Sequence, residues 1–154
     1  MRTENEQIGQ NMFIGEHNHT IDIKGRLIVP SKFRDDLGAH FYLTKGIDGC
    51  LMAYDEEEWA SFEGKLKSLP MTNKDARKMV RFFLAGAADA EVDKQGRILI
   101  PQPLRDYAGL EKDIVLAGMG NRVEIWSRDR YEGETTYEDM DEIAAQLESL
   151  GLSI

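Results

Sequence analysis

The stretch Asp22-Ile23-Lys24-Gly25-Arg26-Leu27-Ile28-Val29-Pro30 has a close copy 71 positions later, Asp93-Lys94-Gln95-Gly96-Arg97-Ile98-Leu99-Ile100-Pro101, and this repetition indicates how the chain folds. Over positions 22–38 and their equivalents, seven of 17 residues are identical, whereas average residue usage gives about one by chance. The repeat indicates two copies of one small structural unit that pack on each other.

Each copy has the pattern strand, glycine turn, strand, short helix, strand, turn, strand. The apolar run Leu27–Val29, which contains the β-branched Ile28 and Val29, is followed by Pro30, and this is typical of a short strand. Pro30 and Pro101 end these strands and begin a helical turn, which stops at Gly38 and Gly109. Four short strands cannot bury both of their faces alone. Two copies in one chain can cover each other's sheet edges. We therefore expect them to form a small closed barrel with pseudo-twofold symmetry.

Two helices are predicted between the copies. Asp55 is a suitable N-cap for a helix over residues 55–69, with Glu58 three positions later and Pro70 after the last residue. A second helix is predicted to open at Thr72. Its predicted apolar face consists of Ala76, Met79, Val80 and Phe83.

A third helix is predicted over residues 136–150, with Gly151 as its stop. Its predicted inward face consists of Met140, Ile143, Leu147 and Leu150. The expected division of the chain is a flexible extension over 1–11, a first repeat over 12–58, a helical connector over 59–86, a second repeat over 87–130 and an acidic C-terminal helix over 131–154. The two repeats form one barrel domain.

The composition favours a globular protein of one domain. The chain has 154 residues, 42% of them hydrophobic, and a single cysteine, Cys50, which excludes an internal disulfide framework. It has no apolar run near the roughly 20 residues that span a bilayer, and the first eleven residues lack the apolar stretch of a secretory signal. We therefore expect a cytoplasmic protein without membrane partners.

The formal net charge of −9 is unevenly distributed. Residues 131–154 contain seven acidic residues and no lysine or arginine, whereas residues 22–34 contain four basic residues against Asp22 alone. Because charges beyond about 8–10 Å are largely screened in salt, the acidic end does not exclude an anionic partner at the basic segment.

The pattern Asp-x-x-x-Arg occurs at both glycine turns, as Asp22 with Arg26 and as Asp93 with Arg97. An aspartate at a turn accepts backbone N–H bonds and can orient the arginine. A guanidinium held at a turn can bind a phosphate or a guanine edge. The alternative is that each pair simply fixes a hairpin. The candidate DNA-binding residues are Lys24, Arg26, Lys32, Arg34, Lys94 and Arg97, oriented by Asp22 and Asp93.

Other clusters give weaker signals. One helical face carries the basic residues Lys74, Arg77, Lys78 and Arg81. Three interpretations are open for this face: it is exposed to solvent, it makes a secondary contact with phosphate, or it contacts another subunit. His17 and His19 alternate on a strand, but His40 is distant, so we expect polar residues on an edge strand and no metal site. Common enzyme motifs are missing from the sequence, so neither an enzyme nor a cofactor is expected. A barrel enzyme remains an alternative.

The opening Met12-Phe13-Ile14-Gly15, followed by Asp22–Pro30, resembles the start of MraZ-family proteins. The segments Asp93–Pro101 and Val123-Glu124-Ile125-Trp126 resemble the second SpoVT/AbrB-like unit of that family. The resemblance covers residues 12–152. Residues 1–11 are extra relative to the family's usual start.

The resemblance implies an α+β fold, namely a double-psi β-barrel of swapped-hairpin, AbrB-like units with flanking helices. It implies a nucleoid-associated repressor of the division and cell-wall gene cluster, including its own gene. Such a protein binds promoter direct repeats in double-stranded DNA as a ring-shaped homo-oligomer, and Arg26 and Arg97 would be the signature arginines. An antitoxin-like or protein-interaction module on the same barrel is the alternative.

Overall fold

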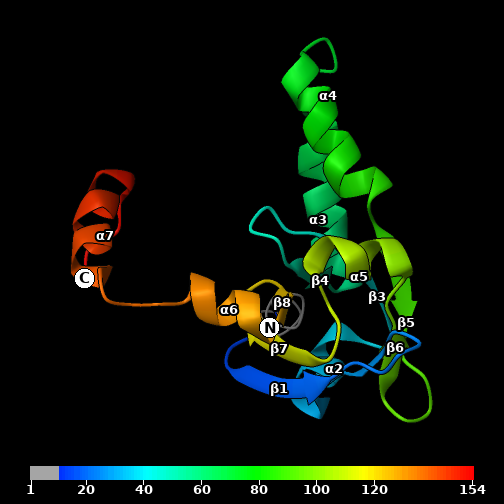
Figure 1. Cartoon of the computed structure of the whole chain (residues 1–154). Coiled ribbons are helices and arrows are strands. Elements are labelled where there is room, and N and C mark those ends of the chain that lie inside the picture. The colour runs from blue at the N-terminus through cyan, green and yellow to red at the C-terminus, as the bar shows by residue number, and fades with distance from the viewer. Residues whose placement is uncertain (1–10) are drawn as a thin grey trace, which may run out of the picture.

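The computed structural model describes residues 11–154, which form an antiparallel sheet flanked by helices (Figure 1). The first repeat contains β1 (Glu16–Thr20), β2 (Arg26–Ile28), α2 (Ser31–Leu37), β3 (His40–Lys45) and β4 (Leu51–Tyr54). The second contains β5 (Ala88–Glu91), β6 (Arg97–Leu99), α5 (Gln102–Ala108), β7 (Asp113–Gly118) and β8 (Val123–Ser127). The predicted order of elements in each copy is confirmed, and the fold is α+β. The extension predicted over 1–11 lies outside the described residues, apart from Asn11.

The two repeats are interleaved in the sheets. The larger sheet has the order β1-β7-β8-β4-β3-β5, so that β1 pairs with a strand of the second repeat and β5 with a strand of the first. A separate two-stranded sheet joins β2 to β6, with Leu27 opposite Ile98. Each repeat therefore supplies one strand to the other's part of the larger sheet, but β1 and β5 lie at its edges, so the closed barrel expected from the sequence stays a prediction.

The main core lies between these sheets. Leu27 and Ile98 point inward from the two-stranded sheet and are almost completely buried. Phe33 of α2 and Leu104 of α5 close the same core at equivalent places in the two repeats. The repeated apolar positions of the sequence therefore meet in one hydrophobic cluster, which fixes the two glycine turns relative to each other.

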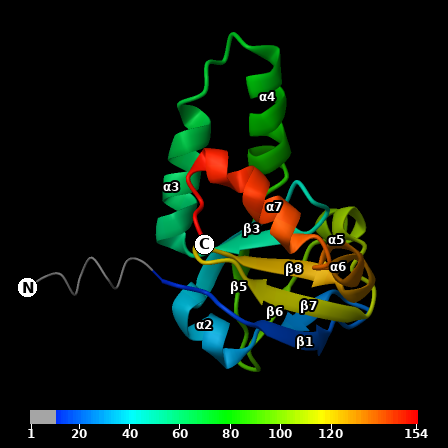
Figure 2. The ribbon, with the colours of Figure 1, turned by 90° about the vertical axis from the view of Figure 1, so that its left-hand side faces the viewer.

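The connector forms an arm that projects from the sheet (Figure 2). It consists of α3 (Glu56–Lys67), α4 (Lys74–Val80) and a π-helical turn, η1 (Arg81–Ala85). The second helix begins one residue later than predicted, because Asn73 rather than Thr72 caps it by accepting a hydrogen bond from the Ala76 N–H. Of the apolar face predicted for this helix, Phe83 is buried and Ala76 and Val80 are half-buried, whereas Met79 is 40% exposed.

The N-cap of α3 is as predicted. The Asp55 carboxylate accepts a hydrogen bond from the Glu58 N–H at 2.7 Å and another from the Asn11 side chain at 2.9 Å. Because Asp55 is buried, we expect Asp55→Ala to destabilise the protein by about 1 kcal/mol. Urea denaturation measures this loss. Asp55→Asn keeps an acceptor and should lose less, and equal losses would contradict the capping role.

The C-terminal segment differs most from its prediction. It contains two short helices, α6 (Arg128–Glu134) and α7 (Met140–Leu147), followed by a 3-10 turn, η2 (Glu148–Leu150), which ends at Gly151 as predicted. The first of these was not predicted; Ser127 caps it at the end of β8. The inward face predicted for the third helix is wrong, because α7 has no buried residue and stands away from the sheet (Figure 1).

His40 bridges three elements in a way that the sequence did not predict. Its ring nitrogens lie 2.8 Å from the Glu56 carboxylate on α3 and 3.3 Å from the Asp89 carboxylate on β5. The hydrogen bonds to Glu56 and then to Asp89 raise the pKa of His40 above the ordinary 6.5. The protonated ring can donate to both carboxylates.

This geometry predicts a pH-dependent stability. A raised pKa in the folded state stabilises the protein below pH 6.5, and this contribution is lost as the pH rises through the folded-state pKa. We expect the free energy of unfolding of the wild type to fall relative to that of His40→Gln between about pH 6 and pH 8. Parallel urea titrations test this. A difference between the two proteins that stays constant with pH would contradict it.

Candidate nucleic-acid interface

The two Asp-x-x-x-Arg turns have nearly the same geometry. In the first, the Asp22 carboxylate accepts hydrogen bonds from the N–H groups of Lys24 and Arg26 at 3.0 and 2.8 Å, and from the Arg26 Nε at 2.7 Å. In the second, Asp93 accepts from the N–H groups of Gln95 and Arg97 and from the Arg97 Nε, each at 2.9 Å. The aspartates therefore orient the arginines, as the sequence predicted.

The hydrogen bonds also keep both aspartates ionised. The Arg26 N–H, followed by the Arg26 side chain, lowers the pKa of Asp22, and Arg97 acts on Asp93 in the same way. Each carboxylate is thus a fixed negative charge that holds a guanidinium by its Nε. The Nη donors of both arginines have no hydrogen-bond partner within residues 11–154.

The pairing of β2 with β6 places the two arginines on one surface. Arg26 lies opposite Leu99, and Arg97 lies opposite Ile28. These four residues alternate with the buried Leu27 and Ile98 and therefore share the outer face of the two-stranded sheet. The side chains of Ile28 and Leu99 are 44% and 57% exposed. We call these four residues, together with the two turns, the hairpin face.

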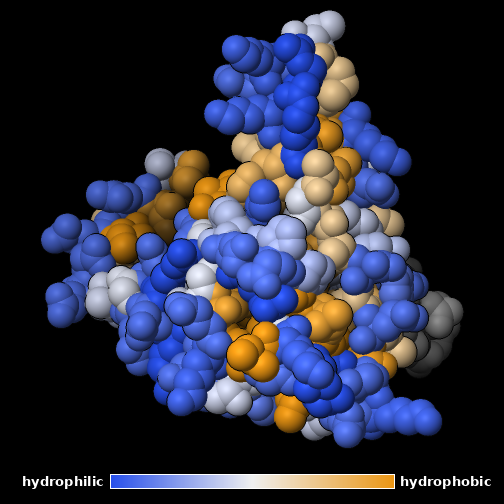
Figure 3. Space-filling model, turned by 45° about the vertical axis from the view of Figure 1, so that its right-hand side comes forward, coloured by the Kyte–Doolittle hydropathy of each residue, from blue (hydrophilic) through white to orange (hydrophobic). Residues whose placement is uncertain are grey.

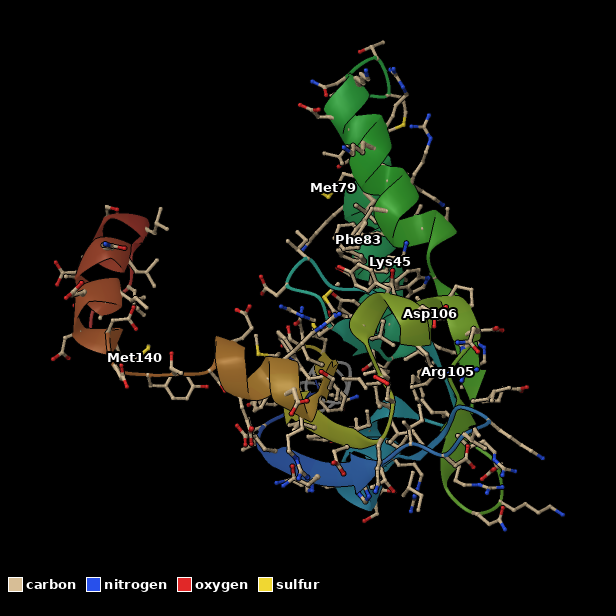
Figure 4. The ribbon with its side chains drawn as sticks, viewed as in Figure 1. Lys45, Met79, Phe83, Arg105, Asp106 and Met140 are labelled. Carbon is tan, nitrogen blue, oxygen red and sulfur yellow. The ribbon has the colours of Figure 1, made fainter. Side chains whose placement is uncertain are left out.

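Two further arginines lock the turns together. The backbone N–H of Val29 donates to the carbonyl of Gly96, and that of Ile100 donates to the carbonyl of Gly25. Arg34 donates to the carbonyl of Val29 and lies against Gly96. Arg105, which is labelled in Figure 4, donates to the carbonyl of Ile100 and lies against Gly25. Each repeat thus supports the turn of the other.

This arrangement separates the candidate residues into two groups. Lys24 and Lys94 are exposed in the turns beside Arg26 and Arg97, and Lys32 is exposed on α2. Arg34 is half-buried and bound to the backbone, so its visible role is to position the second turn. The sequence comparison aligned Arg105 with Arg34, but only the contact with Gly25 reveals its equivalent role.

Charge is separated across the molecule. Residues 22–34 carry a net charge of +3 and residues 93–105 a net charge of +2, whereas residues 131–154 carry −7. The turns and the C-terminal helices lie on opposite sides in Figure 1. The hairpin face is therefore locally basic on a chain whose net charge is −9.

The histidines do not form a metal site in the part of the chain that the structure describes. His17 and His19 lie on the edge strand β1, and the His17 ring packs edge-on against Phe33 with ring centroids 4.9 Å apart. Residues 11–154 contain no group of three or more histidine, cysteine or acidic side chains arranged to hold a metal ion. None of the helices in the same residues is long and apolar enough to cross a membrane.

Comparison with known proteins agrees with the duplicated geometry. The family described as "MraZ protein, putative antitoxin-like" matches residues 12–82 and again residues 83–149. The chain belongs to the MraZ family. Each match contains one turn of the hairpin face, so each of the two family units includes one copy of the repeated segment.

Several MraZ-family relatives match over nearly their whole length. The chain is 60% identical to "Transcriptional regulator MraZ" of Lachnoclostridium phytofermentans, over 92% of this chain and 99% of that protein. It is 57% identical to the protein of the same name in Acetivibrio thermocellus, over 92% of this chain and all of that protein. A solved structure, "The solution structure of PHS018 from pyrococcus horikoshii", aligns over 73% of this chain with 18% identity and a TM-score of 0.32.

Proposed function

We propose that this chain is a sequence-specific DNA-binding transcriptional regulator, a repressor, that contacts double-stranded DNA through the hairpin face. The observation that carries the proposal is the pair of arginines whose Nε is held by an aspartate while their Nη donors remain available on one exposed surface. Relatives with 53–60% identity are named transcriptional regulators.

The chemistry of the hairpin face suits a nucleic acid. A guanidinium fixed in orientation can donate two parallel hydrogen bonds to a phosphate or to the O6 and N7 atoms of guanine. In this proposal Lys24, Lys94 and Lys32 add contacts to phosphates, which position the protein without reading sequence. Arg34 acts with them by holding the second turn in place. Exposed Ile28 and Leu99 beside the arginines can contact the methyl group of thymine.

The finer parts of the proposal concern assembly and target. We propose a ring-shaped homo-oligomer in which several hairpin faces meet promoter direct repeats, because linked weak sites gain effective concentration. The proposed target is the division and cell-wall gene cluster, including the chain's own gene, which would place the protein in the cytoplasm at the nucleoid. No catalytic activity is proposed. We also propose that the two sheets form a double-psi β-barrel, with the repeats at 12–58 and 87–130.

A mobility-shift titration tests the proposal. The probe is the DNA upstream of the chain's own gene, at 50 and 200 mM salt, beside a scrambled duplex of equal length. We expect a shift of the upstream DNA that weakens steeply with salt, because phosphate contacts release counterions. Equal affinity for the scrambled duplex, or no shift at 50 mM salt, would contradict sequence-specific binding.

The family description favours one second function, an antitoxin-like module that binds a protein. The two functions differ in their partner. Capture of a specific protein by the tagged chain, with no shift of upstream DNA in the same buffer, would favour the antitoxin-like function.

A further inference from the structure

Two of the uncovered hydrophobic surfaces of the structure lie outside the hairpin face. The first is a hollow of about 420 Å³ at the base of the arm. Its walls are Ile47 of the β3–β4 turn and Met79 of α4, whose side chains are 69% and 40% exposed. Its floor is made by Phe82 and Tyr107, whose rings meet edge to face. We call this hollow the arm groove.

Basic side chains lie at the floor of the arm groove and on the helix beside it. The Lys45 Nζ lies 5.5 Å from the centre of the Phe82 ring and 5.4 Å from that of Tyr107. Lys78 lines the groove, together with the acidic Asp75. Residues 74–85 of the arm carry a net charge of +3, because they contain four basic residues, one of which is Lys78, and one acidic residue, Asp75. An occupant with a hydrophobic face and acidic flanks would match it.

The second uncovered surface is on α7 and has the complementary character. Met140, Ile143, Ala144 and Leu147 lie on one side of this helix, at the spacing of a helical face. Their side chains are exposed or half-buried, with Met140 46% exposed. Residues 138–148 contain five acidic residues and no basic residue. Leu152 and Ile154 of the tail that follows α7 border this face, but no residue of the helix is buried, so within residues 11–154 the face stays largely uncovered.

The position of α7 argues for a partner in another copy. The segment 135–139 leads α7 away from the sheet, and α7 stands well apart from α4 (Figure 1). Figure 3 shows hydrophobic atoms exposed along the arm and others on the separate α7. Figure 4 shows Met79 and Lys45 on the arm side and Met140 on α7, far from both. Each copy thus offers one helix and one groove that do not meet within the chain.

We propose that the apolar face of α7 packs into the arm groove of a second copy, with its acidic residues against the basic residues of α4. The contact is head to tail, since it joins different surfaces of two identical chains. Such a contact builds a closed ring when the rotation between neighbours closes. The inference deepens the oligomer of the proposed function and rests on that part of it. It also gives the basic face of α4 a subunit contact rather than a phosphate contact.

Cross-linking between two variants, each with one cysteine added to the native Cys50, tests the contact directly. In the first mixture, a tagged Met79→Cys chain and an untagged Met140→Cys chain are treated with a short bismaleimide. In the control mixture, an untagged Ala145→Cys chain replaces the Met140→Cys chain. Ala145 is exposed and, at 100° per residue, lies on the other side of α7. The wild type controls for Cys50, which is buried. We expect a covalent dimer of one tagged and one untagged chain from the first mixture, several-fold more abundant than from the Ala145→Cys mixture.

Light scattering gives a second readout that needs no cross-link. Ile143→Asp should raise the apparent dissociation constant of the oligomer about tenfold or more, whereas Ala145→Asp adds the same charge away from the apolar face and should not. Circular dichroism confirms that both variants fold. Equal dissociation constants for the two variants would overturn the proposal. A cross-link that forms only within a single chain carrying both Met79→Cys and Met140→Cys, and not between chains, would overturn it as well.

The readouts separate this inference from the proposed function. If Ile143→Asp leaves the oligomer intact and upstream DNA is still shifted, the α7 contact is wrong and the regulator stands. If the wild type is monomeric at every concentration tested, both the α7 contact and the ring are wrong. DNA binding through the hairpin face is measured with Arg26→Ala, which lies outside both surfaces of the contact.

Discussion

Arg26→Ala should weaken binding to the upstream DNA by about tenfold to a hundredfold, since one bidentate guanidinium contact contributes roughly 1–3 kcal/mol to discrimination. The double variant Arg26→Ala/Arg97→Ala should lose more, because the two arginines occupy equivalent places on the hairpin face. The change in melting temperature should be small, since the Arg26 side chain is 37% exposed and screened by solvent. Fluorescence anisotropy at fixed salt measures the affinity, and a thermal melt measures stability.

Two further variants make this result specific. Arg26→Lys keeps the charge but loses the planar fork of donors, so it should bind with an affinity between those of the wild type and alanine variants. Arg128→Ala removes the same charge at the start of α6, far from β2 and β6 in Figure 1, and should bind like the wild type. If Arg26→Ala and Arg128→Ala lose the same affinity for DNA, then net charge, rather than the hairpin face, governs binding.

Gly96→Ala should destabilise the protein by about 3 kcal/mol, from two sources. Gly96 has a φ of +79°, and the left-handed conformation costs a residue with a Cβ atom about 1–2 kcal/mol. A Cβ atom there would also lie 2.2 Å from the Arg34 Nη1, so the guanidinium that supports this turn must move. Denaturation in urea measures the loss, and Gly15→Ala provides the matched control, because Gly15 also has a positive φ of +94° but nothing lies within 4 Å of a Cβ atom there.

A double-mutant cycle separates the two sources. Arg34→Ala alone should cost about 1 kcal/mol, because the Val29 carbonyl loses its donor. Adding Gly96→Ala to Arg34→Ala should then cost only the conformational part, so the double variant should be more stable than the sum of the single effects predicts, by roughly 1–2 kcal/mol. Strict additivity would show that Arg34 does not hold the second turn.

The sequence itself determined the repeated unit and its turns. The seven identities between the copies, the glycines at the tight turns and the prolines after the short strands are local signals. They predicted β2, β6 and the hydrogen bonds of Asp22 and Asp93 correctly, because backbone geometry and side-chain bonds over four residues depend little on the rest of the chain. The cap at Asp55 was predictable for the same reason.

The surfaces that those units expose depend on long-range packing, which the sequence does not show. The sequence assigned Arg34 to the DNA because it is basic, whereas packing places it against Gly96 of the other repeat, 62 residues away. Helical spacing predicted an inward face for the third helix, but periodicity gives the side on which apolar residues lie and not what covers them. Whether α7 is covered depends on where the chain carries it after β8, and the bridge from His40 to Asp89 depends on the pairing of β3 with β5. These contacts are long-range, and they exist only once the two repeats have folded together.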